Sequence, residues 1–144
     1  MITKRAKYAL KALLHLAEHG RTTPCQTREM AEQCRIPRKF LEQILLDLRN
    51  RGVVRSYRGQ GGGFTLVGDP GEIRLIDIFR LVDGPMAPLP CLSQTAYTRC
   101  DDCEDEESCG VRRLFLEPYG AMLERAERKT LADGIANSER RRSQ

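Results

Sequence analysis

Residues 37–67 read PRKFLEQILLDLRNRGVVRSYRGQGGGFTLV, which joins a helical pattern to a glycine-rich hairpin pattern. Pro37 suits the first position of a helix, and Gly52 suits the residue that ends one. Between them, apolar residues recur at the three-and-four spacing of one helix face, at Phe40, Leu41, Ile44, Leu45 and Leu48. Two β-prone runs, 53–57 and 64–67, then flank a polar, glycine-rich connection. We therefore expect a helix over 37–51 with this face in the core, followed by a β-hairpin.

The chain before this stretch predicts two more helices. Residues 3–19 carry an apolar stripe, and Gly20 follows as a stop. Thr27 is the expected cap of a short helix over 28–34, and residues 35–37 leave room only for a tight turn. A short helix, a turn and a longer helix have the proportions of a helix-turn-helix, whose second helix enters the DNA major groove. The predicted fold class is mainly α with a small β-hairpin wing, a winged helix-turn-helix.

The candidate DNA-binding residues lie on the polar side of these elements. Glycines in the hairpin let the backbone approach phosphates, while Arg55 and Arg58 add charge or reach into a narrow minor groove. A flexible hairpin tip is the plainer interpretation of the same glycines, and similar helices occur in proteins that never bind DNA. The connection lacks the ending of a P-loop, which excludes ATP binding. The candidates are Arg28, Arg38, Lys39, Glu42, Gln43, Arg55, Arg58, Gly59, Gly61 and Gly62.

The charge is distributed unevenly along the chain. Its 144 residues carry a net charge of +4, but residues 1–70 hold 13 Lys and Arg against 6 Asp and Glu, whereas residues 71–144 hold 11 against 14. A basic half joined to an acidic half suggests that one binds a polyanion while the other has a separate task. No apolar run approaches the roughly 18 residues that span a bilayer, and the N-terminus lacks a secretory signal. We expect a cytoplasmic protein that does not bind membranes.

Past residue 110 the chain predicts a long helix. Its apolar stripe consists of Leu114, Phe115, Tyr119, Met122, Leu123 and Ala126. Such a helix in a small protein most simply packs against its copy in a homodimer, which matches a pseudo-palindromic operator in double-stranded DNA. Pro118 predicts a kink or the true start of the helix, and Thr130 with Asp133 resembles a capping arrangement. The expected organisation is a winged-helix domain over 1–84, a cysteine-rich loop over 85–110, the dimerisation helix over 111–134 and a flexible tail over 135–144.

The cysteine-rich loop predicts a metal site. Cys91, Cys100, Cys103 and Cys109 are interleaved with six carboxylates in a segment that has almost no apolar residues to bury them. Four thiolates suit a 2Fe-2S iron-sulfur cluster and equally suit tetrahedral zinc. A metal-free thiol switch at Cys100 and Cys103 is a third interpretation. The Cys-x-x-Cys pair also occurs in disulfide oxidoreductases, but the βαβ setting of those enzymes is missing. Neighbouring carboxylates disfavour adding an electron, so we expect a low reduction potential for a cluster.

Taken in order, the motifs resemble those of the IscR-like (iron-sulfur cluster regulator) superfamily of winged-helix transcription regulators. The resemblance rests on Lys7-Tyr8-Ala9-Leu10, on Phe40-Leu41-Glu42-Gln43-Ile44, on residues 54–64 and on the cysteine loop. It implies a homodimer that reads DNA with the third helix and the wing, while a cysteine-held cluster reports iron, redox state or nitric oxide. It also implies that Arg38, Lys39, Glu42 and Gln43 read bases and that Arg58 enters the minor groove.

The resemblance implies three cluster ligands, Cys91, Cys103 and Cys109. Arg112 stands where some members have a histidine ligand, and Pro37 stands where the family usually has serine. We therefore expect Cys100 to be the fourth ligand. The prediction is a non-enzymatic, DNA-binding repressor or other transcription regulator with an iron-sulfur sensor. A zinc-bound or thiol-redox repressor, a disulfide oxidoreductase and a protein-binding scaffold are the competing interpretations.

Overall fold

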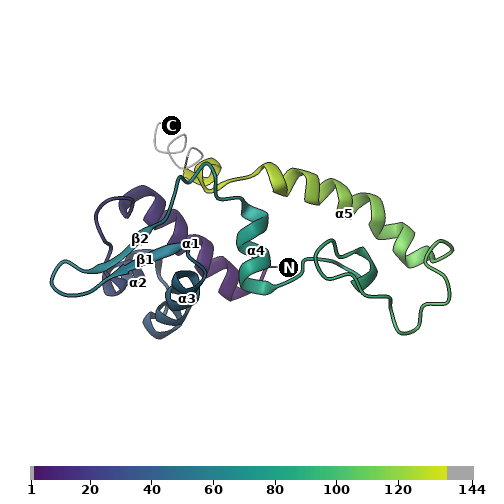
Figure 1. Ribbon diagram of the computed structural model, residues 1–144, viewed down its shortest axis with the longest axis horizontal. Helices are drawn as coiled ribbons and strands as arrows, with labels where there is room; N and C mark the ends of the chain where they lie inside the picture. Colours follow the sequence, from purple (N-terminus) through teal and green to yellow (C-terminus); the bar gives the residue numbers. More distant parts are fainter. Residues whose placement is uncertain (1, 136–144) are drawn as a thin grey trace. The chain divides into compact units, whose positions relative to one another are not determined.

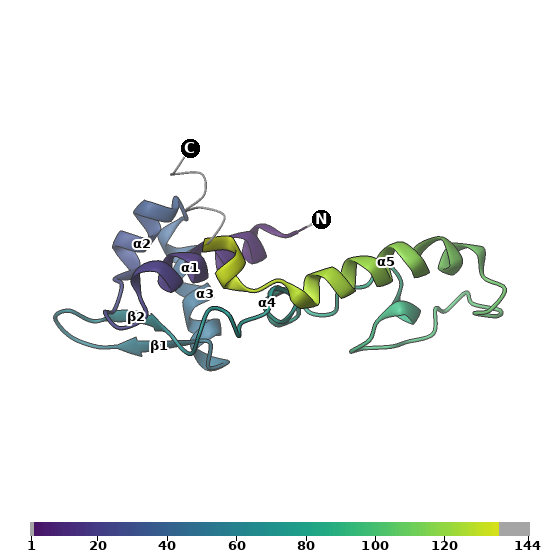
Figure 2. The ribbon, with the colours of Figure 1, turned by 90° about the horizontal axis from the view of Figure 1, so that it is seen from above.

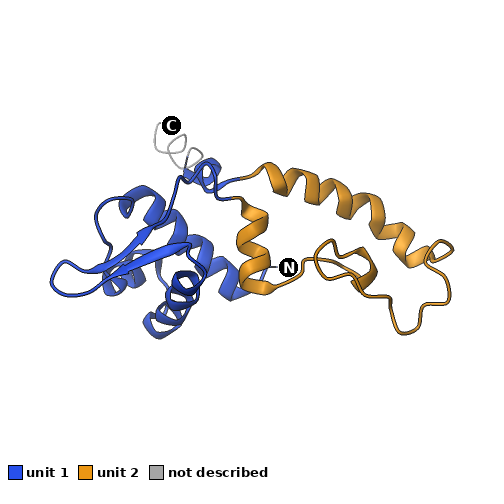
Figure 3. Cartoon of the chain, in the orientation of Figure 1, with its two compact units in different colours: residues 1–73, 130–144 blue, residues 74–129 orange. Residues whose placement is uncertain are grey.

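The computed structural model describes residues 2–135, and these form two compact units. Among the described residues, one unit holds 2–73 and 130–135, and the other holds 74–129 (Figure 3). The tail predicted over 135–144 lies, apart from its first residue, outside the described residues. No helix among residues 2–135 combines the length and the apolar character needed to cross a membrane.

The first unit is a winged helix. Its elements are α1 (Lys4–His19), α2 (Thr27–Cys34), α3 (Arg38–Asn50), β1 (Val54–Tyr57) and β2 (Gly63–Leu66), as Figure 1 shows. The Thr3 hydroxyl caps α1 by accepting a hydrogen bond from the Ala6 N–H at 3.0 Å. The fold class predicted from the sequence is confirmed.

The turn between α2 and α3 rests on a left-handed residue. Arg35 has φ of 55° and follows α2 directly. The Ile36 N–H donates to the Ala31 carbonyl at 2.9 Å, and the Arg35 N–H donates to Glu32 at 3.3 Å. This pattern is a Schellman motif, and Ile36 is buried beneath it. The turn is thus closed by backbone hydrogen bonds without a glycine.

Three local predictions in this region were wrong. Thr27 lies inside α2, and Gln26 occupies the cap position without a side-chain hydrogen bond. Pro37 is the cap residue of α3, and the helix proper begins at Arg38. The Phe40 side chain is 38% exposed and packs edge-to-face on Tyr8, with the ring centroids 5.4 Å apart. The other four predicted core positions of α3 are buried.

The wing is a two-stranded antiparallel hairpin whose strands lie side by side in Figures 1 and 2. Val54 pairs with Leu66, and Tyr57 pairs with Gly63. Phe64 also exchanges two backbone hydrogen bonds of 2.9 Å with Cys25, which ties the hairpin to the segment before α2. A Cβ atom on Gly63 would lie 2.2 Å from the Cys25 carbonyl oxygen, so only glycine fits there.

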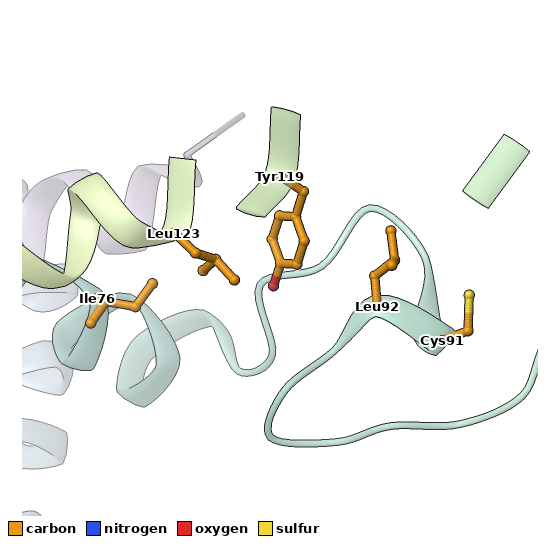
Figure 4. Packing of buried hydrophobic residues seen from close by; sticks show 5 residues of the cluster. All are labelled: Ile76, Cys91, Leu92, Tyr119 and Leu123. Atoms are coloured by element: carbon orange, nitrogen blue, oxygen red, sulfur yellow. The ribbon is translucent and has the colours of Figure 1, made fainter. Parts of the chain in front are cut away.

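The second unit contains α4 (Leu75–Asp83), the short 3-10 helix η1 (Pro90–Leu92) and α5 (Gly110–Arg128). Its core consists of Ile76, Cys91, Leu92, Tyr119 and Leu123 (Figure 4). The Tyr119 hydroxyl donates a hydrogen bond to the Met86 carbonyl. α5 begins at Gly110, which confirms the helix expected past residue 110. Pro118 lies within α5, so of the kink and the helix start predicted there, the start was wrong.

Residues 131–135 are helical and belong to the first unit. The Thr130 N–H donates to Asp133 Oδ2 at 2.8 Å, which confirms the capping arrangement expected for this pair. The Leu131 side chain is buried, and its N–H donates to the Ile73 carbonyl at 3.0 Å. These contacts return the chain to the first unit after α5.

Candidate nucleic-acid interface and cysteine pocket

The polar face of α3 presents every predicted base-reading side chain to solvent. Arg38, Lys39, Glu42 and Gln43 are all exposed, in the first two turns of the helix. The Arg38 Nε atom lies 3.2 Å from Glu42 Oε1, so the carboxylate is partly neutralised before any ligand arrives. Arg28 is exposed on α2 and pairs in the same way with Glu32 at 3.7 Å. The face can therefore offer donors, and one acceptor, to a major groove.

The wing carries a second group of cations. Arg55 lies on β1 opposite Thr65, Arg58 follows the strand, and both arginine side chains are exposed. Gly59 and Gly61 have φ of 89° and 74°, while a Cβ atom on Gly62 would lie 2.4 Å from the Tyr57 carbonyl oxygen. The turn itself therefore requires the three candidate glycines, whatever the wing binds.

Tyr57 belongs to this surface but was absent from the residues predicted to form it. It is exposed at the end of β1. The pKa of Tyr57 is lowered, first by a hydrogen bond from the Arg55 guanidinium and then by one from the Thr65 hydroxyl. The sequence could have indicated this residue, because Tyr57 is an aromatic residue at the end of a predicted wing strand.

In the second unit, the four predicted cysteine ligands line one pocket of about 360 Å³. Four carboxylates and one cation share the lining, namely Asp102, Glu104, Asp105, Glu106 and Arg112. The pocket therefore joins sulfur donors to a mostly anionic rim.

Each cysteine reaches the pocket from a different structural setting. Cys91 lies on η1 within the core of the unit, and its side chain is 7% exposed. The Cys100 thiol hydrogen-bonds with Cys91, and its pKa is raised, first by desolvation and then by that hydrogen bond. Cys103 follows in a tight turn in which its N–H donates to the Cys100 carbonyl at 3.0 Å. Cys109 caps α5, and its Sγ atom accepts a hydrogen bond from the Arg112 N–H at 3.4 Å.

Polar contacts within the loop fix its path. The Arg99 guanidinium donates to the carbonyl oxygens of Cys103 and Glu104, at 3.0 and 2.8 Å. The Asp105 carboxylate accepts from the Ser108 N–H at 2.9 Å, just before α5. These contacts supplement the packing of Cys100 against the hydrophobic core of the unit.

Four cysteines on one pocket fit a cysteine-bound metal group in number and type. Their sulfur atoms are not arranged around a common point in this structure. No three His, Cys, Asp or Glu side chains within residues 2–135 are arranged to hold a metal ion. Four thiolates around a 2Fe-2S core, or around Zn²⁺, would carry a formal charge of about −2. The Nε atom of Arg112 is buried and lacks a hydrogen-bond partner among the described residues. An unpaired cationic donor on a residue that lines the pocket is compatible with such an anionic group.

The remaining cysteines and the histidines lie in the first unit and have ordinary settings. Burial raises the pKa values of Cys25 and Cys34, and the Cys34 thiol donates to the Lys11 carbonyl at 3.9 Å. Desolvation lowers the pKa of His15, which stacks at a tilt on His19. These features support structural roles for the four residues.

α5 exposes large apolar side chains along much of its length. Leu114 is 75% exposed, and four more are also exposed, namely Val111, Phe115, Leu116 and Met122. Only Tyr119 and Leu123 of this helix are buried among the described residues. An apolar helix face of this extent is typical of a protein interface.

Comparison with known proteins gives a consistent result. A family model described as "Rrf2: Iron-dependent Transcriptional regulator" matches residues 2–137. An HTH-type transcriptional regulator of Rhodobacter capsulatus, described as rrf2-like, is 47% identical over 139 residues, which cover 94% of this chain and 93% of the relative. The HTH-type transcriptional regulator IscR of an Enterobacter species is 31% identical over 138 residues, covering 96% and 81%.

A solved structure agrees with this result. The global cysteine regulator CymR of Bacillus subtilis superposes with a TM-score of 0.77 at 28% identity, over 95% of this chain and 97% of that one. With 95% of this chain covered, the likeness extends over both units.

Proposed function

Because this chain belongs to the Rrf2 family of iron-dependent transcriptional regulators and is a helix-turn-helix transcriptional regulator, we propose that it controls transcription through an iron-sulfur cluster held by its cysteine pocket. The cluster would report iron, redox state or nitric oxide. In this proposal the first unit binds a pseudo-palindromic operator as part of a homodimer. The four cysteines on one pocket carry the proposal.

The DNA-binding part of the proposal assigns one task to each exposed group. Lys39 and Gln43 reach base edges from α3, and Glu42 accepts from a cytosine amino group while Arg38 holds it. Arg55 and Arg58 bind phosphate or the minor groove from the wing, and Arg28 binds phosphate from α2. Contacts to phosphate would set the register, and the side chains of α3 would select the sequence.

The sensing part assigns Cys91, Cys100, Cys103 and Cys109 as ligands. Their thiolates would hold the cluster, and the helix N-terminus behind Cys109 favours negative charge on its sulfur. When bound, an iron-sulfur cluster supplies one-electron redox chemistry and reactivity toward nitric oxide. The hydrogen bond from Arg99 to the Cys103 carbonyl would keep Cys103 on the pocket during ligation. Ligation would require the four side chains to converge.

A thiol switch is the second candidate, and one observation favours it. The Cys100 thiol contacts Cys91 in the structure, so a metal-free switch would join these two residues. The similar structure of CymR, described as a global cysteine regulator, supports a candidate without a cluster. Zinc on the four thiolates is the remaining metal-bound candidate.

An enzymatic role and a scaffold role receive less support than a regulatory one. The relatives are transcriptional regulators, which favours a regulator over a disulfide oxidoreductase. The same family membership favours DNA over protein as the ligand of α3. A cytoplasmic location follows from the proposed action on DNA.

Metal analysis of anaerobically purified protein tests the sensing proposal. The expected result is a brown protein with roughly two irons and two sulfides per chain, and an absorption spectrum that bleaches with nitric oxide. The variant with Cys91, Cys100, Cys103 and Cys109 all replaced by serine should be colourless, whereas a Cys25→Ser, Cys34→Ser variant should keep the colour. One zinc per chain, or no metal at all, would contradict the iron-sulfur proposal.

A further inference from the structure

Arg112 combines three features that the proposed ligands do not explain. It lines the cysteine pocket, and its backbone N–H donates to Cys109 Sγ at 3.4 Å. Its Nε atom is buried, and within residues 2–135 this donor has no hydrogen-bond partner. The backbone of Arg112 is thus held beside the Cys109 sulfur, while its side-chain Nε–H group lacks an acceptor among the described residues.

A buried cationic donor without a partner is unfavourable in a folded protein. Burial removes the water that would otherwise accept from the N–H, and nothing in the described chain replaces it. In native structures such a group usually accompanies a bound ion, a water molecule or a catalytic or redox role. The bound species should therefore be an acceptor, and the positive charge of arginine selects an anion.

The other charged residues that line the pocket are all acidic, in contrast to Arg112. Asp102, Glu104, Asp105 and Glu106 all line the pocket and disfavour any further negative charge there. Arg112 is the cation that shares this lining in the described chain. A group with a formal charge of about −2, bound by four thiolates, would be repelled by the carboxylates and attracted by the guanidinium.

We propose that Arg112 is a positioning and charge-tuning residue whose guanidinium donates an N–H···S hydrogen bond to the cysteine-bound cluster and stabilises its reduced state. This inference rests on the proposed iron-sulfur function. Reduction adds one negative charge to the cluster, so a nearby cation and a hydrogen bond to sulfur both favour the reduced form. Arg112 thereby opposes the carboxylates and raises the reduction potential that they lower.

The chain offers a matched control one residue away. Arg113 lies on the same helix and is exposed, and its guanidinium donates to the Glu107 carbonyl at 3.4 Å. It is absent from the lining of the cysteine pocket. Arg112→Met and Arg113→Met therefore remove the same charge from neighbouring positions, and both keep an unbranched side chain in α5.

The test is a redox titration of the cluster in the intact, anaerobically purified protein. In Arg112→Met, the ratio of reduced to oxidised cluster at a fixed potential should fall at least tenfold, a shift of about 59 mV for one electron. Arg113→Met should stay within twofold of the wild type. Arg112→Lys, which keeps the charge without the planar fork, should fall between Arg112→Met and the wild type. Deuterium exchange should shift the iron-sulfur vibrations of the wild type. Arg112→Met should show a smaller shift, because only the backbone N–H of residue 112 still donates to Cys109 Sγ.

Three other results would overturn the role of Arg112, and one of them would also overturn the proposed function. Equal potentials in the wild type and Arg112→Met, or equal shifts in Arg112→Met and Arg113→Met, overturn the role of Arg112 while the cluster stands. A wild-type protein without iron overturns the proposed function and this inference together. If Arg112→Met fails to fold by circular dichroism, Arg112→Gln decides the question, because it removes the charge, and a wild-type potential in that variant refutes the charge-tuning role of Arg112.

Discussion

At the scale of single residues, the backbone contact between Gly63 and Cys25 holds the base of the wing. Gly63 has φ of 145°, and a Cβ atom there would overlap the Cys25 carbonyl oxygen at 2.2 Å. Gly63→Ala should therefore break the bridge between Cys25 and Phe64 and destabilise the chain by about 2–4 kcal/mol. Urea unfolding measures the change.

Gly71→Ala is the control for this substitution. A Cβ atom on Gly71 would lie 3.2 Å from the exposed Asp69 carboxylate, which can move aside. Its expected effect is within about 0.5 kcal/mol. Equal effects of the two substitutions would show that the Gly63 contact does not constrain the wing.

At Arg35 a substitution should increase stability, because glycine adopts the positive φ of this position more easily than arginine does. A residue with a Cβ atom is strained at φ of 55°, and the Schellman turn needs that geometry. Arg35→Gly should stabilise the chain by about 0.5–1 kcal/mol in thermal or urea unfolding. A loss of stability would mean that the Arg35 side chain makes a contribution larger than the strain.

Single residues were the least predictable part of the fold. The apolar pattern of α3 placed Leu41, Ile44, Leu45 and Leu48 correctly in the core. It misplaced Phe40 because an apolar residue at the edge of a helix face can find a partner such as Tyr8 on another helix. Arg35 gave no signal at all, since arginine carries no preference for a left-handed turn.

At the scale of elements, the two arginines of the wing should contribute to DNA binding mainly through their charge. Arg55→Ala and Arg58→Ala should each weaken binding to all sequences, and each should reduce the slope of log affinity against log salt by about 1. Arg128→Ala is the charge-matched control, because Arg128 pairs with Glu124 at 2.9 Å on α5. Fluorescence anisotropy over a range of salt concentrations measures the slopes.

The salt slopes show whether the wing arginines contact phosphate or whether the hairpin makes no contact with DNA. A wing that binds phosphate gives two reduced slopes and an unchanged control. Unchanged slopes in Arg55→Ala and Arg58→Ala would contradict the role proposed for the wing, and would leave its glycines with only their structural reason, the tight turn.

Elements with strong local patterns were predicted well. The helix-turn-helix and the hairpin follow from spacing and turn residues that lie close together in the sequence. The start of α5 near residue 110 was predicted, but the alternative start at Pro118 was wrong. Proline normally marks a boundary, whereas Pro118 occupies an exposed position where water can satisfy the carbonyl group left without its N–H partner. The path of the cysteine loop was not predictable, because it depends on contacts such as Arg99 with Cys103 and Glu104.

At the scale of the whole molecule, the exposed apolar face of α5 should hold two copies together. Leu114→Glu with Phe115→Glu places two charges on that face and should raise the dimer dissociation constant at least a hundredfold. Leu46→Glu is the control, because Leu46 is a similarly exposed apolar residue on α3. Sedimentation velocity at several concentrations distinguishes dimer from monomer, and a double variant that remains dimeric contradicts the interface.

The sequence indicated the whole-molecule arrangement only in outline. Four cysteines in a carboxylate-rich stretch predicted a shared site, and the structure brings all four to one pocket. The contact between Cys91 and Cys100 and the unpaired donor of Arg112 came from the fold alone, since neither leaves a periodic trace in the sequence.

The central claim is that the state of the cysteine pocket controls DNA binding, and the affinity of one protein for one DNA fragment tests it most directly. The fragment is enriched from a random pool by the wild-type protein, and its dissociation constant is measured anaerobically before and after the cluster is destroyed with nitric oxide. We expect a change of at least tenfold in the wild type, and none in the variant with Cys91, Cys100, Cys103 and Cys109 replaced by serine. An unchanged affinity in the wild type, or the same change in the serine variant, would contradict the account.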